Sequence, residues 1–252
     1  MTQPEVSPDA SARTTMIGFA AGPLQTNCYL LFAEPVDPAE VASYIEQPPA
    51  PATASPTTSA PTTTSPQSMS VVDPGMGSAP VIQRIADQLH CRIDAVYLTH
   101  GHIDHMRDAH LLGAPVYLHA ADIPMAQHPE FLGPELAMLF DTDHMGPIAD
   151  LRELGDTATL GGEQWEVHHM PGHSPGSVMY RRNGHILGGD VLFRQSIGRT
   201  DLPLSNPADM ADSLRRLRQT FADGDIVLPG HGPQTTIGEE KASNPYLQGQ
   251  PL

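Results

Sequence analysis

The run Thr99-His100-Gly101-His102-Ile103-Asp104-His105 places four side chains that commonly bind metals within six positions. It follows Ala95–Leu98, whose apolar residues predict a strand. The first two histidines are two residues apart, so on an extended backbone both can reach one ion. The aspartate and the last histidine lie on the next bend, where they can reach a second ion. Imidazole and carboxylate are ligands of Zn²⁺ and similar cations in catalytic sites. The run therefore predicts a metal site at a strand end, with a histidine-rich surface loop as the plainer alternative.

Three further residues of metal-binding types stand at the ends of strand-like segments. His173 follows Trp165–Val167, Asp190 ends the apolar run that starts at His185, and His231 follows Ile226–Leu228. Glycines flank all three, and glycine lets the backbone turn sharply close to an ion. The sequence thus contains seven candidate ligands, and we expect them to converge at one edge of the fold.

These residues together resemble the metallo-β-lactamase superfamily, whose signature is H-x-H-x-D-H followed by separate His, Asp and His ligands in that order. The resemblance runs from about Met16 to the end of the chain. It implies an α+β fold, the αββα sandwich, in which two mixed sheets face each other and helices cover the outside. It also implies two ligand sets bridged by Asp190: His100, His102 and His173 for one metal, and Asp104, His105 and His231 for the other.

Hydrophobic patterning agrees with this architecture. Strands are predicted at residues 16–20, 27–33, 70–73, 115–119, 158–160, 164–168, 177–181 and 185–187. Helices are predicted at residues 78–90, at about 108–112, and after Asn206, which suits an N-cap before Pro207. Strands mixed with amphipathic helices are expected of a layered sandwich.

Composition limits the classes of function. A chain of 252 residues can form one domain, and its formal net charge of −16 opposes binding to nucleic-acid phosphates. Met1–Thr15 lacks the basic start and apolar core of a signal peptide, and no stretch approaches the roughly 20 apolar residues of a membrane span. Cys28 and Cys91 are expected to be buried free thiols, as in a reducing cytoplasm. We therefore expect a cytoplasmic protein that binds a small molecule, and neither nucleic acid nor membrane; its oligomeric state stays open.

One segment is not expected to belong to the fold. From Gln47 to Ser70 the chain is nearly all Pro, Thr, Ser and Ala, which cannot bury enough apolar surface to offset the entropy of ordering. We predict a flexible tail at residues 1–15, followed by a single domain over 16–252 with a disordered insertion at about 47–69. A domain boundary at the insertion is the alternative, although the residues before it are too few to fold alone.

Two metals at an open edge predict hydrolysis without a protein nucleophile. Two cations about 3.5–4 Å apart can hold a bridging hydroxide at neutral pH and polarise an electrophilic oxygen. The resemblance implies that Asp104 receives a proton during this attack. Zinc is the expected metal, with iron or manganese as alternatives, because the same ligands accept all three.

Two stretches narrow the resemblance. Phe193–Asp201 resembles the F-x-x-S-I-G-R-T-D segment of short glyoxalase II-like hydrolases, and Thr235–Tyr246 resembles their T-T-I-G-x-E…N-P-[FY] tail. This implies hydrolysis of a hydroxyacyl thioester to a hydroxy acid and a thiol. Arg199 and Tyr246 are candidate substrate contacts; the alternatives are an ion pair between Arg199 and Asp201 that fixes the loop, and a packing anchor at Tyr246.

Other activities of the superfamily stay open. Full-length glyoxalase II has a helical C-terminal domain that binds glutathione, whereas residues 232–252 alone follow His231 here, which leaves the thiol carrier undetermined. A persulfide dioxygenase-like protein would use one iron on His100, His173 and Asp190. Lactonase and phosphodiesterase activities are further alternatives. Secreted β-lactamases of the superfamily differ at Asp190, where they have Cys or Ser, and a non-catalytic role is disfavoured because no ligand position is lost.

Overall fold

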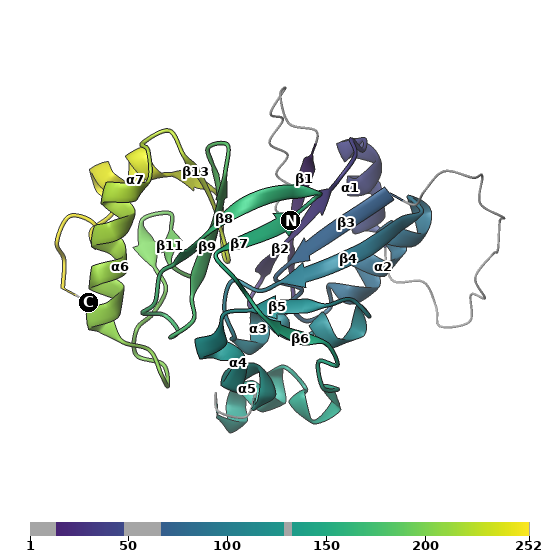
Figure 1. The fold of residues 1–252 in the computed structure, drawn as a ribbon. Coiled ribbons are helices and arrows are strands. Elements are labelled where there is room, and N and C mark those ends of the chain that lie inside the picture. Colours follow the sequence, from purple (N-terminus) through teal and green to yellow (C-terminus); the bar gives the residue numbers. More distant parts are fainter. Residues whose placement is uncertain (1–13, 48–66, 129–132, 252) are drawn as a thin grey trace.

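The computed structural model describes residues 14–47, 67–128 and 133–251. Two six-stranded sheets pack face to face, and helices cover their outer faces (Figure 1). The αββα sandwich expected from the sequence is therefore confirmed.

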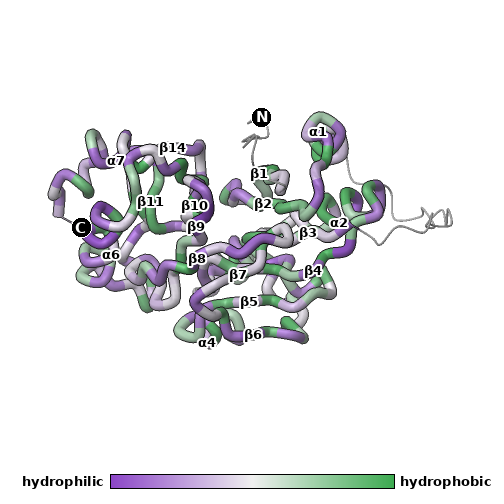
Figure 2. The backbone as a smooth tube through the Cα atoms, turned by 45° about the horizontal axis from the view of Figure 1, so that its top comes forward, coloured by the Kyte–Doolittle hydropathy of each residue, from purple (hydrophilic) through white to green (hydrophobic). Residues whose placement is uncertain are grey.

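The first sheet is built from the N-terminal half of the chain. Its strands, in spatial order, are β1 (Thr15–Ala21), β2 (Thr26–Phe32), β3 (Gln67–Val72), β4 (Cys91–Tyr97), β5 (Val116–Leu118) and β6 (Leu151–Glu153). The first three strands pair antiparallel, and β3 to β6 pair parallel. Helices α1 (Pro38–Glu46) and α2 (Ala79–Gln88) cover its outer face. Hydrophobic and hydrophilic residues alternate along α2 (Figure 2), and its buried residues include Ile82 and Ile85.

The second sheet comes from the C-terminal half. Its spatial order is β14 (Thr235–Thr236), β13 (Ile226–Pro229), β10 (His185–Gly189), β9 (Val178–Arg182), β8 (Glu163–His169) and β7 (Thr157–Leu160). Only β10 and β13 pair parallel. Helix α6 (Pro207–Thr220) starts as predicted, because the Asn206 side chain accepts hydrogen bonds from the amides of Ala208 and Asp209. Helix α7 (Ile237–Ser243) begins with a capping box formed by Thr236 and Glu239.

Three buried apolar clusters correspond to the three interfaces between the four layers. The first lies between the first sheet and α1 and α2, and includes Ile82 and Val96. The second lies between the two sheets and includes Tyr97 and Tyr180. The third lies between the second sheet and α6, and includes Leu217. The central strands of the two sheets, such as β2, β3 and β10, thus pack on both faces, which fixes their register and the position of their ends.

Short helices occupy the connections of the first sheet. They are α3 (Ile103–Met106), the 3₁₀ turns η1 (Ala109–Leu111), η2 (Ala120–Asp122) and η4 (Thr142–His144), α4 (Ile123–Gln127) and α5 (Pro134–Leu139). The short helix predicted at about 108–112 is present as the 3₁₀ turn η1, flanked by Asp108 and Leu112, whereas α3 before it was not predicted. The sequence did not predict α1, α4 or α5, since each is short and buries at most two side chains.

The predicted limits of the tail and the insertion need correction. Residues 1–13 and 48–66 lie outside the described part, but Thr15 already belongs to β1, and Gln67, Ser68 and Met69 belong to β3. Gln67 and Ser68 are polar like the insertion, yet their backbones pair with β4, which requires no apolar side chain. Cys28 and Cys91 are free, as predicted, although Cys91 is only partly buried. Within the described residues, no helix is long and apolar enough to cross a membrane.

Candidate metal centre

The seven predicted ligands come from four connections at one edge of the sandwich. The loop after β4 carries His100 and His102 and runs into α3, which carries Asp104 and His105. The other three, His173, Asp190 and His231, lie in the connections that follow β8, β10 and β13 of the second sheet. Because the contributing strands belong to both sheets, the site forms only when the two sheets pack together.

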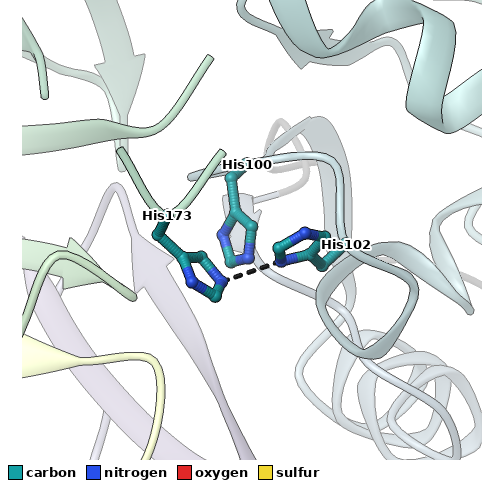
Figure 3. Close-up of side chains that lie close together, drawn as sticks. All are labelled: His100, His102 and His173. Atoms are coloured by element: carbon teal, nitrogen blue, oxygen red, sulfur yellow. Dashed lines mark hydrogen bonds between the residues drawn. The ribbon is translucent and has the colours of Figure 1, made fainter. Parts of the chain in front are cut away.

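The structure brings all seven side chains together. Their ligand atoms form three groups, each within 4.8 Å: His100, His102 and His173; His100, His105 and Asp190; and Asp104, His105 and His231. Figure 3 shows the first group, with the three imidazole rings converging from two loops. Six of the seven side chains are buried, and His231 is about a quarter exposed, at 25%. The grouping matches the two expected ligand sets, while the role of each residue as a ligand stays a prediction.

A buried carboxylate orients two of the rings. The Nδ1 atom of His105 lies 2.9 Å from Asp73 Oδ2, and Asp73 also accepts hydrogen bonds from the amide of Thr99 at 2.8 Å and from its hydroxyl at 2.6 Å. The same hydroxyl oxygen lies 3.1 Å from His100 Nδ1. With Nδ1 held in this way, His100 and His105 direct Nε2 into the cluster, as metal-binding histidines commonly do.

Backbone carbonyls orient two other rings. His173 Nδ1 donates to the carbonyl of Arg199 at 2.8 Å, and His231 Nδ1 donates to the carbonyl of Leu24 at 3.1 Å. Each ring therefore presents Nε2 to the cluster. His102 is turned the other way, because its Nδ1 lies 2.8 Å from His173 Nε2 (Figure 3).

Several buried atoms of the cluster have no hydrogen-bond partner among the described residues. They are His100 Nε2, His102 Nε2, His105 Nε2 and Asp190 Oδ1. His105 Nε2 and Asp190 Oδ1 lie 3.3 Å from each other without forming a hydrogen bond, and His102 directs Nδ1 rather than Nε2 toward His173. An unsatisfied buried polar group costs about 1–3 kcal/mol, so His100 Nε2 and the facing His105 Nε2 and Asp190 Oδ1 indicate a missing partner. Imidazole nitrogens with carboxylate oxygens are the donor set of zinc, iron and manganese. The residues therefore fit a pair of divalent cations.

Asp190 lies between two of these groups, called below the first group (His100, His102 and His173) and the second group (Asp104, His105 and His231). Its Oδ2 is 3.4 Å from His173 Nε2 and 3.5 Å from His231 Nε2, and its Oδ1 is 3.3 Å from His105 Nε2. One carboxylate thus reaches a residue of the first group and two of the second, which is the position that a bridging ligand requires.

The two groups differ in protonation. Burial lowers the pKa of His102 to about 3 and that of His100 well below its usual range, so both rings are neutral and ready to bind a cation. In the second group burial lowers the pKa of His231, but hydrogen bonds to Asp104 and Asp190 outweigh it and raise the value to about 9. Burial raises the pKa of Asp104, but the facing His105 and His231 outweigh it and lower the value to about 2. Without metal, imidazolium charge therefore balances the carboxylates of the second group.

Two glycines allow the loops to approach Asp190 closely. A Cβ atom on Gly230 would lie 2.1 Å from Asp190 Oδ1, and one on Gly198 would lie 1.9 Å from its carbonyl oxygen and 3.0 Å from His173 Cγ. Any side chain at these positions would displace a ligand. This explains the glycine before His231 and the one within the S-I-G-R-T-D segment, which packs against the site through its backbone.

The two predicted substrate contacts lie in different surroundings. Arg199 forms a bidentate ion pair with Asp201, at 2.7 and 3.0 Å, and both side chains are exposed. This is the geometry of the loop-fixing alternative, while the Arg199 carbonyl supports His173. Tyr246 packs beside the third cluster and lines a groove of about 660 Å³ with Leu214 and Arg218 of α6. A substrate contact for either residue stays a prediction.

The sequence reasoning missed three buried residues that form hydrogen bonds with the ligand rings or with the loops that carry them: Asp73, Thr99 and Asp122. Asp73 had a recognisable signal, because it follows the apolar Val71-Val72 and precedes Pro74-Gly75, like the other ligands at strand ends. Asp122 had none, since it is one of many acidic residues in the chain. It accepts a hydrogen bond from the Gly101 amide at 2.8 Å, between the first two histidines.

The chain is similar in sequence to proteins of several bacteria. The model of the family described as the metallo-beta-lactamase superfamily matches residues 70–231. An uncharacterized protein of Mycobacterium tuberculosis is 35% identical, over 92% of this chain and 97% of that protein. The hydroxyacylglutathione hydrolase GloC of Haemophilus influenzae is 32% identical, over 78% of this chain and 95% of the relative.

Solved structures share the fold. The crystal structure of the BLEG-1 B3 metallo-beta-lactamase is 29% identical, covers 93% of this chain and 100% of its own, and superposes with a TM-score of 0.66. The crystal structure of TTHA1623 in a di-iron-bound form is 30% identical, covers 91% and 99%, and superposes with a TM-score of 0.63. The chain therefore belongs to the metallo-β-lactamase superfamily, and its fold, its histidine and aspartate clusters and its relatives are those of a metal-dependent hydrolase.

Proposed function

We propose that this chain is a glyoxalase II-like hydrolase that cleaves a hydroxyacyl thioester into a hydroxy acid and a thiol. The observation that carries the proposal is the convergence of seven ligand-type side chains in three overlapping groups at one edge of the sandwich. The resemblance of residues 193–201 and 235–246 to short glyoxalase II-like hydrolases adds support. So does the similarity to a relative named hydroxyacylglutathione hydrolase.

In this proposal two divalent metals occupy the cluster. His100, His102 and His173 would hold one, Asp104, His105 and His231 would hold the other, and Asp190 would be shared between them. Two such ions supply Lewis acidity toward the thioester carbonyl and lower the pKa of a water molecule to about 7. Zinc is the proposed metal; the 30% identical structure in a di-iron-bound form keeps iron as an alternative, and manganese accepts the same ligands.

Asp104 is the proposed proton acceptor. Its Oδ2 accepts a hydrogen bond from the Thr26 hydroxyl at 3.0 Å and lies 3.1 Å from His231 Nε2. Because its pKa is about 2, the carboxylate is ionised at neutral pH. So weak a base would take a proton only from a water whose own pKa the metals had lowered. Oxygen from water then bonds to the carbonyl carbon, the carbon–sulfur bond breaks, and the sulfur leaves as a thiolate that takes up a proton.

The proposed partner is a small-molecule thioester, with Arg199 and Tyr246 as candidate contacts. Arg199 is already paired with Asp201, so its charge is partly neutralised toward an anionic carrier. We therefore leave the thiol carrier open and test glutathione first, because the named relative acts on its hydroxyacyl thioester.

A substrate and metal panel tests the proposal. Protein loaded with zinc, iron or manganese is incubated with a hydroxyacylglutathione, and thiol release is followed with a thiol-reactive dye. We expect release that requires metal and is lost in His100→Ala. Oxygen uptake with glutathione persulfide by iron-loaded protein, without thioester cleavage, would instead establish the dioxygenase alternative. Preferential cleavage of a lactone, a phosphodiester or a β-lactam would likewise overturn the thioester assignment.

A further inference from the structure

Asp122, at the end of η2, lies between the two loops that carry the first group of histidines. Its relative exposure is 0%, and it belongs to the connection after β5, not to a ligand loop. Neither the composition of that connection nor any role proposed above explains why a charged side chain is fully buried there.

The carboxylate of Asp122 accepts three short hydrogen bonds from the two loops. Its Oδ2 accepts from the Gly101 amide at 2.8 Å and from the Ser174 hydroxyl at 2.6 Å, and its Oδ1 accepts from the Gly176 amide at 2.6 Å. Gly101 separates His100 from His102 and follows β4 of the first sheet. Ser174 directly follows His173, beyond β8 of the second sheet. One buried side chain therefore joins the backbones that carry all three histidines.

Close packing fixes this junction. A Cβ atom on Gly176 would lie 2.7 Å from Asp122 Cγ, and one on Gly101 would lie 3.0 Å from the Asp122 carbonyl oxygen. The Ser177 hydroxyl accepts from the Ser174 amide at 3.1 Å and lies 2.8 Å from the Ser174 hydroxyl, so the second loop is closed on itself. These contacts explain the glycine within H-G-H and the two serines and the glycine within H-S-P-G-S.

A second contact joins the same two connections. The rings of His119, just before η2, and His169, at the end of β8, stack with centroids 4.1 Å apart and planes inclined by 13°. The junction thus has a buried polar part at Asp122 and a stacked part beside it. Since a buried carboxylate is costly unless its hydrogen bonds are satisfied, the three donors around Asp122 must hold their positions.

We infer that Asp122 is a positioning residue that sets the separation of His102 and His173, and with it the affinity of the first metal, without touching that metal. This inference rests on the proposed roles of His100, His102 and His173 as ligands. Residues that hold ligands in place typically change metal affinity by about 10–100-fold when they are replaced.

The test compares Asp122→Asn in two backgrounds, each of which keeps one predicted metal. His231→Ala retains the first set of ligands, and His173→Ala retains the second. Co²⁺ is titrated into each protein, and binding is followed by its visible absorption. We expect Asp122→Asn to weaken Co²⁺ binding about 10–100-fold and change the spectrum in the His231→Ala background, with less than a threefold change in the His173→Ala background.

Asp108→Asn is the matched control. Asp108 is also buried, and its Oδ2 accepts from the amides of Gly77 and Ala79 at 2.8 and 3.0 Å, but it caps the start of α2 and not a histidine loop. A variant that only destabilises the fold should weaken Co²⁺ binding equally in both backgrounds, and Asp108→Asn shows how large that general effect is. Ser174→Ala removes one of the three donors and keeps the carboxylate, so it serves if Asp122→Asn does not fold, and a smaller loss confined to the first site is expected.

The outcomes separate this inference from the proposed function. Unchanged affinity and spectrum of the first site in Asp122→Asn and Ser174→Ala would overturn the positioning role. Equal weakening of both sites would overturn it as well. If the His231→Ala protein binds no Co²⁺ at all, the ligand assignment itself fails, and with it the dinuclear model.

Discussion

His105 donates a hydrogen bond from Nδ1 to Asp73 Oδ2 at 2.9 Å, and both side chains are buried. Asp73 adopts a left-handed backbone conformation, with φ 53°, directly after β3. Because the same carboxylate accepts two hydrogen bonds from Thr99, it supports the loop before His100 as well as the ring of His105. A residue just after β3, the strand next to β4, thus positions ligands of both groups.

Replacing Asp73 should weaken metal binding without removing a ligand. Asp73→Asn leaves a single acceptor oxygen where three donors converge, so we expect about a 10–100-fold loss of zinc affinity, measured by competition with a chromophoric chelator. Asp94→Asn, which breaks the ion pair with Arg92 on β4, is the control and should leave affinity unchanged. Unaltered affinity in Asp73→Asn would show that the hydrogen bond to His105 has no role in metal binding.

The seven clustered side chains predict two metals per chain. Elemental analysis of the purified protein should give close to two, and His231→Ala should reduce this to about one, because that ring belongs only to the second group. His173→Ala should also retain one ion, in the other position. A single tightly held iron in the unmutated protein would contradict the dinuclear model and favour a mononuclear one.

Metal binding to the second group should release protons. The raised pKa of His231, about 9, means that its ring is protonated at pH 7.5 without metal, while a ligand must be neutral. His102, with a pKa of about 3, is already neutral and releases none. Burial lowers the pKa of His105, but the facing Asp190, Asp104 and Asp73 raise it well above its usual value, so this ring also has a proton to lose. Affinity for the second ion should therefore rise with pH from 7 toward 9 and beyond. Calorimetric titration in buffers of different ionisation enthalpy measures this release, and heats that do not depend on the buffer would refute it.

Asp190 should be the most sensitive carboxylate of the site. Asp190→Asn preserves size but removes the charge that faces both groups, so we expect turnover to fall at least about a hundredfold, with reduced metal content. Asp201→Asn, which breaks only an exposed ion pair with Arg199, should have a mild effect. Similar small losses in the two variants would mean that Asp190 does not bridge the metals.

The Pro/Thr/Ser/Ala-rich insertion should be dispensable. Strand β2 pairs with β3 from Tyr29↔Val72 to Phe32↔Met69, and α1 packs on the first cluster through Val41, which is fully buried. Replacing residues 48–66 by a short Gly/Ser linker keeps all of these elements, and loop closure depends only weakly on length. Melting temperature and thiol-release activity should change little. A collapse of folding or activity would show that the insertion packs or acts.

The ligand types and their order could be predicted from the sequence. The histidines and aspartates stand directly after apolar strand-like segments, and backbone turns at glycine leave few places for them except the ends of those strands. Strong periodicity made helices α2 and α6 predictable for the same local reason: one face of each is apolar, and Asn206 and Pro207 mark a helix start. Short helices such as α1 and α5 had no comparable signal, because their few buried side chains create no repeat.

Only the tertiary structure decided which atoms meet. His102 and His173 are separated by 70 intervening residues and lie on different sheets, so their 2.8 Å approach depends on how the sheets pack. The same holds for Asp122, whose neighbours in sequence do not distinguish it from surface carboxylates, and for the hydrogen bonds that join the buried Asp73 to Thr99 and His105. Protonation also follows from three dimensions, since burial lowers the pKa of His102 while facing carboxylates raise that of His231. Local sequence determines the chemical groups at each strand end, whereas distance, burial and charge pairing arise from contacts between residues far apart in the chain.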